Sequence, residues 1–402
     1  MLERVFPLAL VLCSSAVAQR GFVLTDTAAN VHLDDLTITP ALLGLEGDWS
    51  VTRATLRGGK QEGVDSITIK TGEVTAVVLP TRGMNVYEVR CGEHRLGWDS
   101  PSAEIVHPAL VDLESRGGLG WLEGFNEWMV RCGLEYAGHP GTDEFTTNTG
   151  DTATLDLTLH GRIGHLPATR VELIVDGDGR LRLVGTAYER MFYGPKLRLD
   201  SEFSVKPGER AWRISDMVTN VGAAPQEFQL IYHGNYGAPL LGEGARLVVP
   251  ARSIAPMNAK AAGAIDTWDV YRGPTAGFLE EVYLIEPYSN ARGTTAALLI
   301  APGGRLATSV SWNVNELPYF TQWKNTAAEA DGYVTGMEPA TGFPFNRKVE
   351  RAAGRVPTLA PGEARSFTLD FALHLEDEVV AAEARVRAIQ GERVTERRGL
   401  PE

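Results

Sequence analysis

Two short segments carry residue types that are suited to acid–base chemistry. One carboxylate, Glu338, lies in a stretch punctuated by glycine and proline, residues 336–344. One imidazole, His233, ends a strand-like run and is followed by the small and polar residues 234–237. Burial between Met337 and Pro339 is expected to raise the pKa of Glu338 and make it a better base. His233 titrates near neutrality and can donate a proton, so the pair predicts acid–base catalysis.

Two glycine-rich segments supply candidate substrate-binding residues. Residues 117–128 surround Asn126 and Glu127 with aromatic rings. Aromatic faces match the C–H side of a sugar ring, while an amide and a carboxylate bind its hydroxyls; a packed corner of the fold is the alternative. The second segment, residues 159–167, holds His160, Arg162 and His165 as substrate contacts or metal ligands. A third metal ligand would have to come from the distant His233 or Glu338.

Four further polar residues are candidates for binding a substrate. Arg82 lies at a strand end before a glycine, where its guanidinium can fork onto two hydroxyls or a carboxylate. A structural ion pair is an equally good interpretation of Arg82. Asn235 follows His233 closely, and Gln322 and Lys324 flank a tryptophan in the segment that leads to Glu338.

Composition limits the classes of partner. The chain has 402 residues, of which 44% are hydrophobic, and a net charge of −13. Phosphate binding needs a basic face, so this charge argues against a nucleic-acid partner. We see no linker that would divide the chain, and β-rich sandwiches often exceed about 250 residues as one unit. Residues 19–402 are therefore predicted to form a single domain.

The first residues resemble an export signal. Arg4 gives a minimal positive region, residues 6–11 are apolar, and Ala16-Val17-Ala18 supplies a small-x-small cleavage pattern. The apolar run is too short to span a bilayer, and a buried N-terminal helix is the alternative. Residues 1–18 therefore predict a periplasmic or secreted protein. Export would permit a disulfide between Cys91 and Cys132, although sequence cannot show that the two residues approach each other.

Short alternating segments separated by turn residues indicate an antiparallel β fold. Residues 66–70 and 74–79 flank one short loop, and residues 171–175 and 180–184 flank another, as in β-hairpins. Helical periodicity is clear at residues 376–392 and weaker at residues 103–112. The pattern predicts a mainly β sandwich with a C-terminal helix. Further predicted strands cover residues 197–205, 211–218, 296–300, 306–312 and 366–374.

Together these segments resemble the aldose 1-epimerase (galactose mutarotase-like) superfamily, in its DUF4432 branch. The matching stretches are residues 79–86, 117–140, 159–167, 231–241, 318–324 and 336–347. The resemblance implies an all-β antiparallel supersandwich with an open sugar-binding cleft and no cofactor. It also implies that Glu338, in an Glu-Pro-x-Thr context, is the base and that His233 is the proton donor. His160 and Arg82 match the family's substrate-binding histidine and arginine, whereas Gly234 replaces the proline expected after the donor histidine.

The expected function is that of an exported carbohydrate-active enzyme that interconverts sugar anomers without a metal. Glu338 would remove the anomeric hydroxyl proton while His233 protonates the ring oxygen. The two groups should lie about a sugar ring apart, with His160 and Arg82 lining the same cavity. One alternative is a lyase or hydrolase acting on an oxidised or uronic sugar, with a metal at His160, His165 and His233. Another is a non-catalytic glycan-binding protein, and the sequence leaves the oligomeric state open.

The N-terminal pattern makes a direct prediction about the mature protein. Because the small-x-small motif ends at Ala18, the mature chain should begin at Gln19 or very near it. Mass spectrometry of the N-terminal peptide, on protein recovered from its native cell, measures this. Recovery of the chain with Met1 intact would end the secretion hypothesis.

Overall fold

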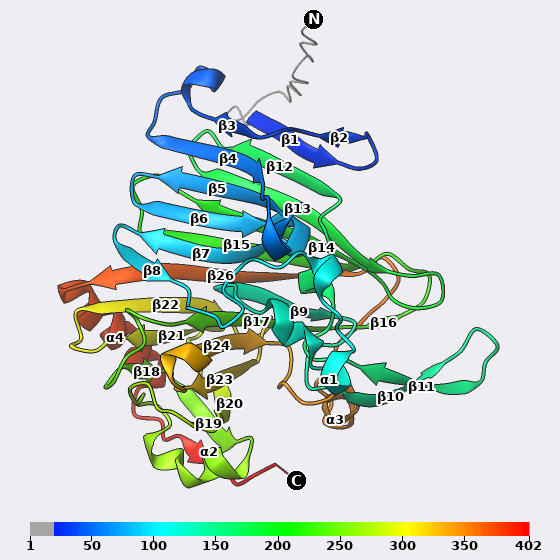
Figure 1. Ribbon diagram of the computed structural model, residues 1–402. Coiled ribbons are helices and arrows are strands. Elements are labelled where there is room, and N and C mark those ends of the chain that lie inside the picture. Colours follow the sequence, from blue (N-terminus) through cyan, green and yellow to red (C-terminus); the bar gives the residue numbers. More distant parts are fainter. Residues whose placement is uncertain (1–19, 402) are drawn as a thin grey trace, which may run out of the picture.

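Two large antiparallel sheets face each other in the computed structural model, which describes residues 20–401 (Figure 1). The predicted export signal lies outside the described residues and stays a prediction. Within the described part of the chain, the first sheet has ten strands. In spatial order they are β18 (Arg246–Val248), β21 (Thr294–Ile300), β22 (Leu306–Asn313), β26 (Ala364–Leu375), β15 (Ala211–Asn220), β14 (Lys196–Val205), β13 (Leu181–Arg190), β12 (Arg170–Val175), β1 (Arg20–Asp26) and β2 (Val31–His32).

The second sheet carries the segments that the sequence singled out. Its strands within residues 20–401 are β27 (Glu396–Arg397), β19 (Ala251–Pro256), β20 (Glu281–Pro287), β23 (Tyr319–Asn325), β24 (Val334–Ala340), β17 (Gln229–Tyr236), β9 (Met129–Leu134), β7 (Asn85–Cys91), β6 (Val74–Leu79), β5 (Asp65–Thr71), β4 (Trp49–Thr55) and β3 (Leu36–Ile38), with β8 (His94–Leu96) beside β7. The neighbours pair antiparallel except β27 and β19, which are parallel. Two small ribbons pair β10 (Gly141–Thr146) with β11 (Thr152–Leu157) and β16 (Gln226–Glu227) with β25 (Thr358–Leu359).

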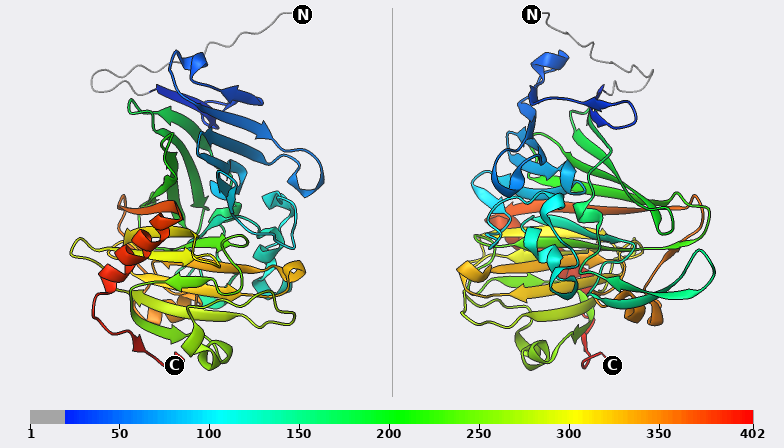
Figure 2. Two further views of the ribbon diagram at one scale, coloured as in Figure 1. Left: turned by 90° about the vertical axis from the view of Figure 1, so that its left-hand side faces the viewer. Right: turned by 45° about the vertical axis from the view of Figure 1, so that its right-hand side comes forward.

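The predicted hairpins and the C-terminal helix are confirmed. β5 pairs with β6 and β12 with β13 around the turns that the sequence indicated. Helix α4 (Asp377–Gln390) packs its buried Val379, Ala382 and Val386 on the outer face of the ten-stranded sheet (Figure 2). The shorter helices are α1 (Ser115–Gly118), α2 (Ala259–Gly263) and α3 (Arg347–Ala352).

The weaker helix prediction, over residues 103–112, is wrong. This stretch contains only a 3₁₀ turn at Pro108–Leu110, and His107 before it is extended with ψ of 132°. Proline lacks the N–H that a helix interior needs and disfavours a helical conformation of the preceding residue. Among the described residues, no helix is long and apolar enough to cross a membrane. Cys91 and Cys132 are both buried and free, so the disulfide that export would permit is not formed.

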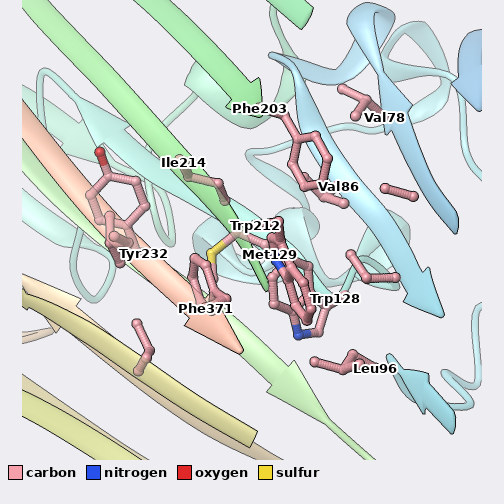
Figure 3. Packing of buried hydrophobic residues seen from close by; sticks show 14 of the residues in the cluster. Val78, Val86, Leu96, Trp128, Met129, Phe203, Trp212, Ile214, Tyr232 and Phe371 are labelled. Carbon is pink, nitrogen blue, oxygen red and sulfur yellow. The ribbon is translucent and has the colours of Figure 1, made fainter. Parts of the chain in front are cut away.

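A single aromatic-rich core fills the space between the two sheets (Figure 3). Trp128, just before β9, packs edge-on against Trp212 of β15 and Phe371 of β26, with ring centroids 5.8 and 5.0 Å away. Tyr232 and Tyr236 of β17 belong to this core, whereas Ile231 of the same strand belongs to a second cluster on the outer face of the sheet. Because both faces are covered, every residue of β17 and β24 is buried.

One buried ion pair joins the two sheets through this core. Arg131 of β9 binds both carboxylate oxygens of Asp216 of β15, through Nε and, at 3.0 Å, through Nη2. Its Nη1 also donates to the Met84 carbonyl at 2.8 Å. The Tyr232 hydroxyl donates to Asp216 at 2.9 Å. The Arg131 and Asp216 side chains are 1% and 0% exposed, so each charge depends on the other for its solvation.

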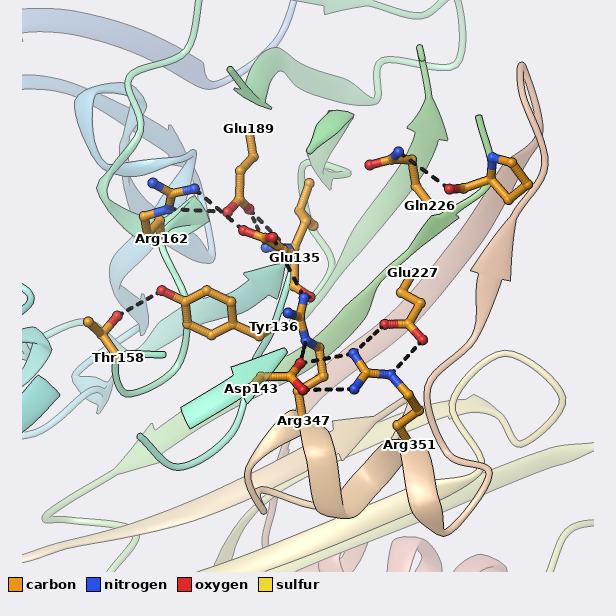
Figure 4. Close-up of polar contacts among 12 residues, drawn as sticks. Glu135, Tyr136, Asp143, Thr158, Arg162, Glu189, Gln226, Glu227, Arg347 and Arg351 are labelled. Carbon is orange, nitrogen blue, oxygen red and sulfur yellow. Dashed lines mark hydrogen bonds and ion pairs between the residues drawn. The ribbon is translucent and has the colours of Figure 1, made fainter. Parts of the chain in front are cut away.

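The hairpin β10–β11 projects from the side of the sandwich (Figure 1). Its base is held by the buried Asp143, which binds Arg347 and Arg351 of α3 (Figure 4). The two ends of the hairpin return to the outer face of the thirteen-stranded sheet. His139 and Pro140 precede β10, and His160 follows β11.

The ion pair between the sheets predicts a large loss of stability on removal of one partner. Asp216→Ala leaves the Arg131 charge buried and unpaired, which typically lowers the free energy of unfolding by about 3–5 kcal/mol. Asp370→Ala is the matched control. Asp370 of β26 forms a half-exposed ion pair with Arg213, which lies on β15 as Asp216 does, and the substitution breaks that pair. Such surface pairs contribute about 0–1 kcal/mol. Urea unfolding measures both variants, and equal losses would contradict the assigned role of Asp216.

Candidate active site

His233 and Glu338 lie side by side on neighbouring strands. The register that pairs Gly234 of β17 with Met337 of β24 places His233 opposite Glu338. Their Nε2 and Oε1 atoms are 3.3 Å apart, and the two side chains are 6% and 2% exposed. Thr321 of β23 is paired with Glu338 from the other side. The three side chains therefore form a row across the outer face of the sheet.

This contact corrects the expectation that the two groups lie a sugar ring apart. Directly opposed residues on antiparallel strands have Cβ atoms about 4.5–5.5 Å apart, which leaves no room for a ring between them. A substrate must therefore approach both groups from the same side. Within the described residues, the buried Glu338 Oε1 has no polar partner beyond its contact with His233 Nε2.

A glycine makes room for the Glu338 carboxylate. Gly336 lies two residues earlier on the same face of β24, beside Trp323 of β23. A Cβ atom at position 336 would lie 2.3 Å from Glu338 Oε1 and 3.2 Å from Trp323 Cβ. Any side chain at this position would therefore displace the carboxylate.

Asn235 fixes the tautomer of His233. The Asn235 amide nitrogen donates to the carbonyls of Glu127, at 3.0 Å, and His233, at 3.1 Å, which sets the orientation of the amide. Its Oδ1 therefore faces His233 Nδ1 at 2.8 Å and accepts that proton. Nε2, the atom that faces Glu338, is left with its lone pair.

Burial shifts both groups toward their uncharged forms. Burial raises the pKa of Glu338 well above its usual value, and the negative charge of Glu280 adds to this. Burial also lowers the pKa of His233 well below its usual value, with a further contribution from His160. Both shifts favour the uncharged arrangement of the pair, in which the proton that the two groups share lies on Glu338.

The row forms the floor of a cavity of about 290 Å³. Its polar lining consists of His233, Glu338, Thr321 and His160 at the floor and of the exposed His139 and Glu280 at the rim. The rest of the lining is apolar: Leu119, Trp121, Leu122, Phe125, Pro140, Leu159, Met257, Val282, Trp323 and Pro344.

Aromatic rings enclose the imidazole of His233. The ring centroids of Phe125, Trp323 and Trp121 lie 5.3, 5.6 and 6.1 Å from that of His233. His160 is 5.3 Å away and adopts a left-handed backbone with φ of 59°. A non-glycine residue in this conformation costs about 1–3 kcal/mol and is often retained at functional sites. Burial lowers the pKa of His160 to about 4, so its imidazole is neutral at pH 7.

Arg82, Asn126 and Glu127 lie outside the cavity, which makes the prediction that Arg82 lines it wrong. Arg82 Nε donates to Glu127 Oε1 at 2.6 Å, and its other nitrogens bind the carbonyls of Val106 and Gly124. Arg82 and Glu127 are thus buried partners of each other. The Asn126 amide nitrogen donates to the Glu104 carbonyl.

Gln322 and Lys324 also do not line the cavity. They alternate along β23 with Thr321 and Trp323, which do, so their side chains point to the opposite face of the sheet. Gln322 donates to the Tyr271 hydroxyl, and Lys324 donates to the carbonyls of Thr267 and Val270. Both residues are structural.

The remaining predicted contacts fall beside the cavity. The partly exposed Arg162 pairs with Glu135 and with the buried Glu189 (Figure 4). His165 is buried with neither ring nitrogen hydrogen-bonded to a described residue, and its ring centroid is 6.5 Å from that of Trp121. Asn235 holds His233 but does not itself line the cavity. Within residues 20–401, no group of three or more His, Cys, Asp or Glu side chains is placed to hold a metal ion.

The sequence interpretation missed His139, Glu280 and Thr321. His139 stands between a glycine and a proline, a signal that resembles the one around Glu338. Glu280 directly precedes β20, and its Oε2 accepts a hydrogen bond from Trp323 Nε1 at 2.8 Å. Nothing in the local sequence distinguishes Thr321 from other strand threonines, because only its register with Glu338 gives it a place in the row.

Comparisons with known proteins place the chain in a family. The family model described as a domain of unknown function (DUF4432) matches residues 61–373. A crystal structure from Klebsiella pneumoniae, of a protein provisionally named aldose 1-epimerase, is 37% identical with a TM-score of 0.90. That match covers 95% of this chain and 99% of the Klebsiella chain. No curated protein matches the chain.

More distant structures share the fold alone. A galactose mutarotase-like protein from Clostridium acetobutylicum is 13% identical with a TM-score of 0.56, covering 82% of this chain and 99% of its own. Galactose 1-epimerase from Lactobacillus acidophilus is 15% identical with a TM-score of 0.50, covering 82% and 100%. The mainly β sandwich is thus a galactose mutarotase-like fold. The chain belongs to the DUF4432 family, within the aldose 1-epimerase (galactose mutarotase-like) superfamily.

Proposed function

We propose that this protein interconverts the anomers of a sugar, with His233 and Glu338 as the catalytic pair. The observation that carries the proposal is their 3.3 Å contact at the floor of an aromatic-walled cavity of about 290 Å³. Such a volume suits one monosaccharide, because pockets for larger ligands run from about 300 to 1,000 Å³. Family membership supports the proposal, since the Klebsiella relative carries the provisional name aldose 1-epimerase. Export remains part of the proposal and rests on residues 1–18.

The pair can open a sugar ring by moving two protons. His233 Nε2, which is unprotonated because Nδ1 carries the proton, accepts the proton of the anomeric hydroxyl. The protonated carboxyl of Glu338 donates its proton to the ring oxygen. The bond between the anomeric carbon and the ring oxygen breaks, the anomeric carbon becomes an aldehyde, and the ring oxygen becomes a hydroxyl.

The open-chain intermediate leaves the pair charged but balanced. An imidazolium at His233 and a carboxylate at Glu338 then lie 3.3 Å apart in a buried site, where opposite charges attract strongly. Rotation about the bond next to the aldehyde presents its other face, and both protons return as the ring closes. The enzyme regains its starting state without a cofactor or a net change in protons.

These roles are the reverse of those expected from the sequence for the first step. The sequence interpretation made Glu338 the base and His233 the donor, which requires the shared proton to begin on His233. The burial of both groups favours the opposite starting arrangement. Because ring closure uses each group in the other sense, both groups still serve as acid and base in every turnover.

Replacement of Glu338 tests the catalytic assignment. Glu338→Gln keeps the shape but removes the proton that the ring oxygen receives, so the exchange rate should fall about 10²–10⁴-fold. NMR exchange spectroscopy across a panel of neutral, deoxy and uronic sugars measures the rate. Glu329→Gln, on the exposed turn between β23 and β24, is the matched control and should retain the wild-type rate.

Two outcomes would contradict the proposal in different ways. Equal exchange rates for Glu338→Gln and the wild type would show that Glu338 does not transfer the proton. Saturable sugar binding by a wild type that never accelerates exchange would identify a glycan-binding protein instead.

The dependence of the rate on pH should be bell-shaped, because the active pair holds one proton. Below the lowered pKa of His233 a second proton removes the base, so the acid limb should lie below pH 6.5, the ordinary histidine value. Above the raised pKa of Glu338 the acid is lost, so the alkaline limb should lie well above pH 4.5. Initial-rate NMR at constant ionic strength measures both limbs.

Glu280→Gln provides the control for this profile. Its charge contributes to the raised pKa of Glu338, so the neutral amide should move the alkaline limb to lower pH while leaving the acid limb in place. An acid limb above pH 6.5 would contradict the lowered pKa of His233.

A further inference from the structure

The cavity offers no partner for an anionic sugar. Among the described residues that line it, the titratable side chains are two carboxyl groups, Glu280 and Glu338, and three histidines whose pKa values are lowered. The lining contains no lysine or arginine. The nearest candidate cations are committed elsewhere. Arg82 binds Glu127 and two carbonyls, and Lys324 faces the other side of the sheet. A buried carboxylate or phosphate would therefore stay unpaired beside two carboxyl groups, which is strongly unfavourable.

The floor has few hydrogen-bonding groups beyond the catalytic pair. If the pair holds the anomeric and ring oxygens, His160 and Thr321 remain for the rest of the sugar. His160 Nδ1 donates to the Ala137 carbonyl at 3.0 Å, so its Nε2 can accept from one hydroxyl. Thr321 Oγ1 is buried and has no hydrogen-bond partner among the described residues. Both groups flank the pair, within reach of a hydroxyl next to the anomeric carbon.

The walls above this floor are mainly carbon, and their one buried polar atom without a hydrogen-bond partner among the described residues is the indole nitrogen of Trp121. They are formed by Trp121, Phe125, Leu159, Met257, Val282 and Trp323. A hydroxyl pressed against such a wall loses its water without gaining a partner, whereas a methyl group gains from burial. His139 and Glu280 stand only at the exposed rim, where a hydrogen bond replaces one to water and contributes little to selectivity.

We propose that the cavity is specific for an uncharged sugar with an apolar substituent away from its anomeric carbon, of which a 6-deoxyhexose is the simplest. The inference rests on the proposed function only in placing the anomeric carbon at His233 and Glu338. It names a substrate class narrower than neutral sugars and rejects uronic acids and sugar phosphates.

Calorimetric titration of the full-length wild type with matched sugars tests this. The probes are 6-deoxygalactose against galactose, 6-deoxyglucose against glucose, and galacturonate as the anionic member. Each deoxy sugar should bind at least about 10-fold more tightly than its hexose, as expected for one group in an apolar pocket, and galacturonate should not saturate. Equal or tighter binding of the hexoses, saturable binding of galacturonate, or no binding by any sugar would each overturn the inference.

Two wall and floor variants locate the selectivity. Val282→Thr keeps the side-chain shape but adds a hydroxyl to the wall, so it should narrow the preference for the deoxy sugar. Thr321→Val removes a floor hydroxyl and should weaken both members of each pair by the same factor, leaving the ratio unchanged. A wild-type ratio in a folded Val282→Thr protein, checked by its thermal unfolding, would overturn the assignment of the wall. The wild-type panel decides the proposal even if this variant does not fold.

Exchange rates on the same samples separate the inference from the proposed function. The predicted order of affinities without any acceleration of anomer exchange would support the substrate class and refute the proposed catalysis. Accelerated exchange with equal affinity for hexoses and deoxy sugars would do the reverse.

Discussion

The Arg131–Asp216 ion pair lies between the two sheets, directly behind the strands that carry the candidate site. Arg131 stands on β9 between Val130 and Cys132, whose side chains belong to the outer-face cluster beneath the cavity. Asp216 also binds the hydroxyl of Tyr232, the residue before His233. A movement of β9 or β17 relative to the opposite sheet would separate two buried charges, which is costly. The position of the imidazole is thus fixed from behind by an interaction that never meets the substrate.

The outer face adds a second set of constraints, which act on single atoms. Asn235 holds the proton on one nitrogen of His233, and Gly336 leaves the space that the Glu338 carboxylate occupies. Asn235 lies on β17 with His233, and Gly336 lies on β24 with Glu338. Sites built on strands are held more precisely than sites on loops, since the backbone hydrogen bonds of the sheet fix each residue. The aromatic cover then removes water from a pair that is already in place.

Much of the fold could be predicted because its signals are local. The hairpins β5–β6 and β12–β13 show alternation and turn residues within a few positions of each other. The segments of His233, His160 and Glu338 were recognisable from glycine, proline and aromatic neighbours, and the structure brings these three side chains to one cavity. Even so, β17 and β24 show no alternation, because both of their faces are buried.

What could not be predicted depends on long-range pairing and on strand register. Arg82 and Glu127 are 45 residues apart, and no local pattern indicates that they neutralise each other. In β23, Thr321 and Trp323 face the cavity while Gln322 and Lys324 face inward. A shift of one residue in register would exchange these two pairs, so residue type alone could not choose between them. The free Cys91 and Cys132 likewise reflect positions that only the folded chain defines.

The hairpin β10–β11 separates the control of ligand shape from the chemistry. One end supplies His139 and Pro140 to the rim, and the other supplies Leu159 and His160 to the wall and floor. Its base is clamped to α3 by Asp143, while His233 and Glu338 stand on strands of a different sheet. A change in the length or composition of this one hairpin would therefore remodel the cavity from two sides without moving His233 or Glu338. The shape of the cavity and the acid–base groups at its floor therefore depend on separate stretches of the chain.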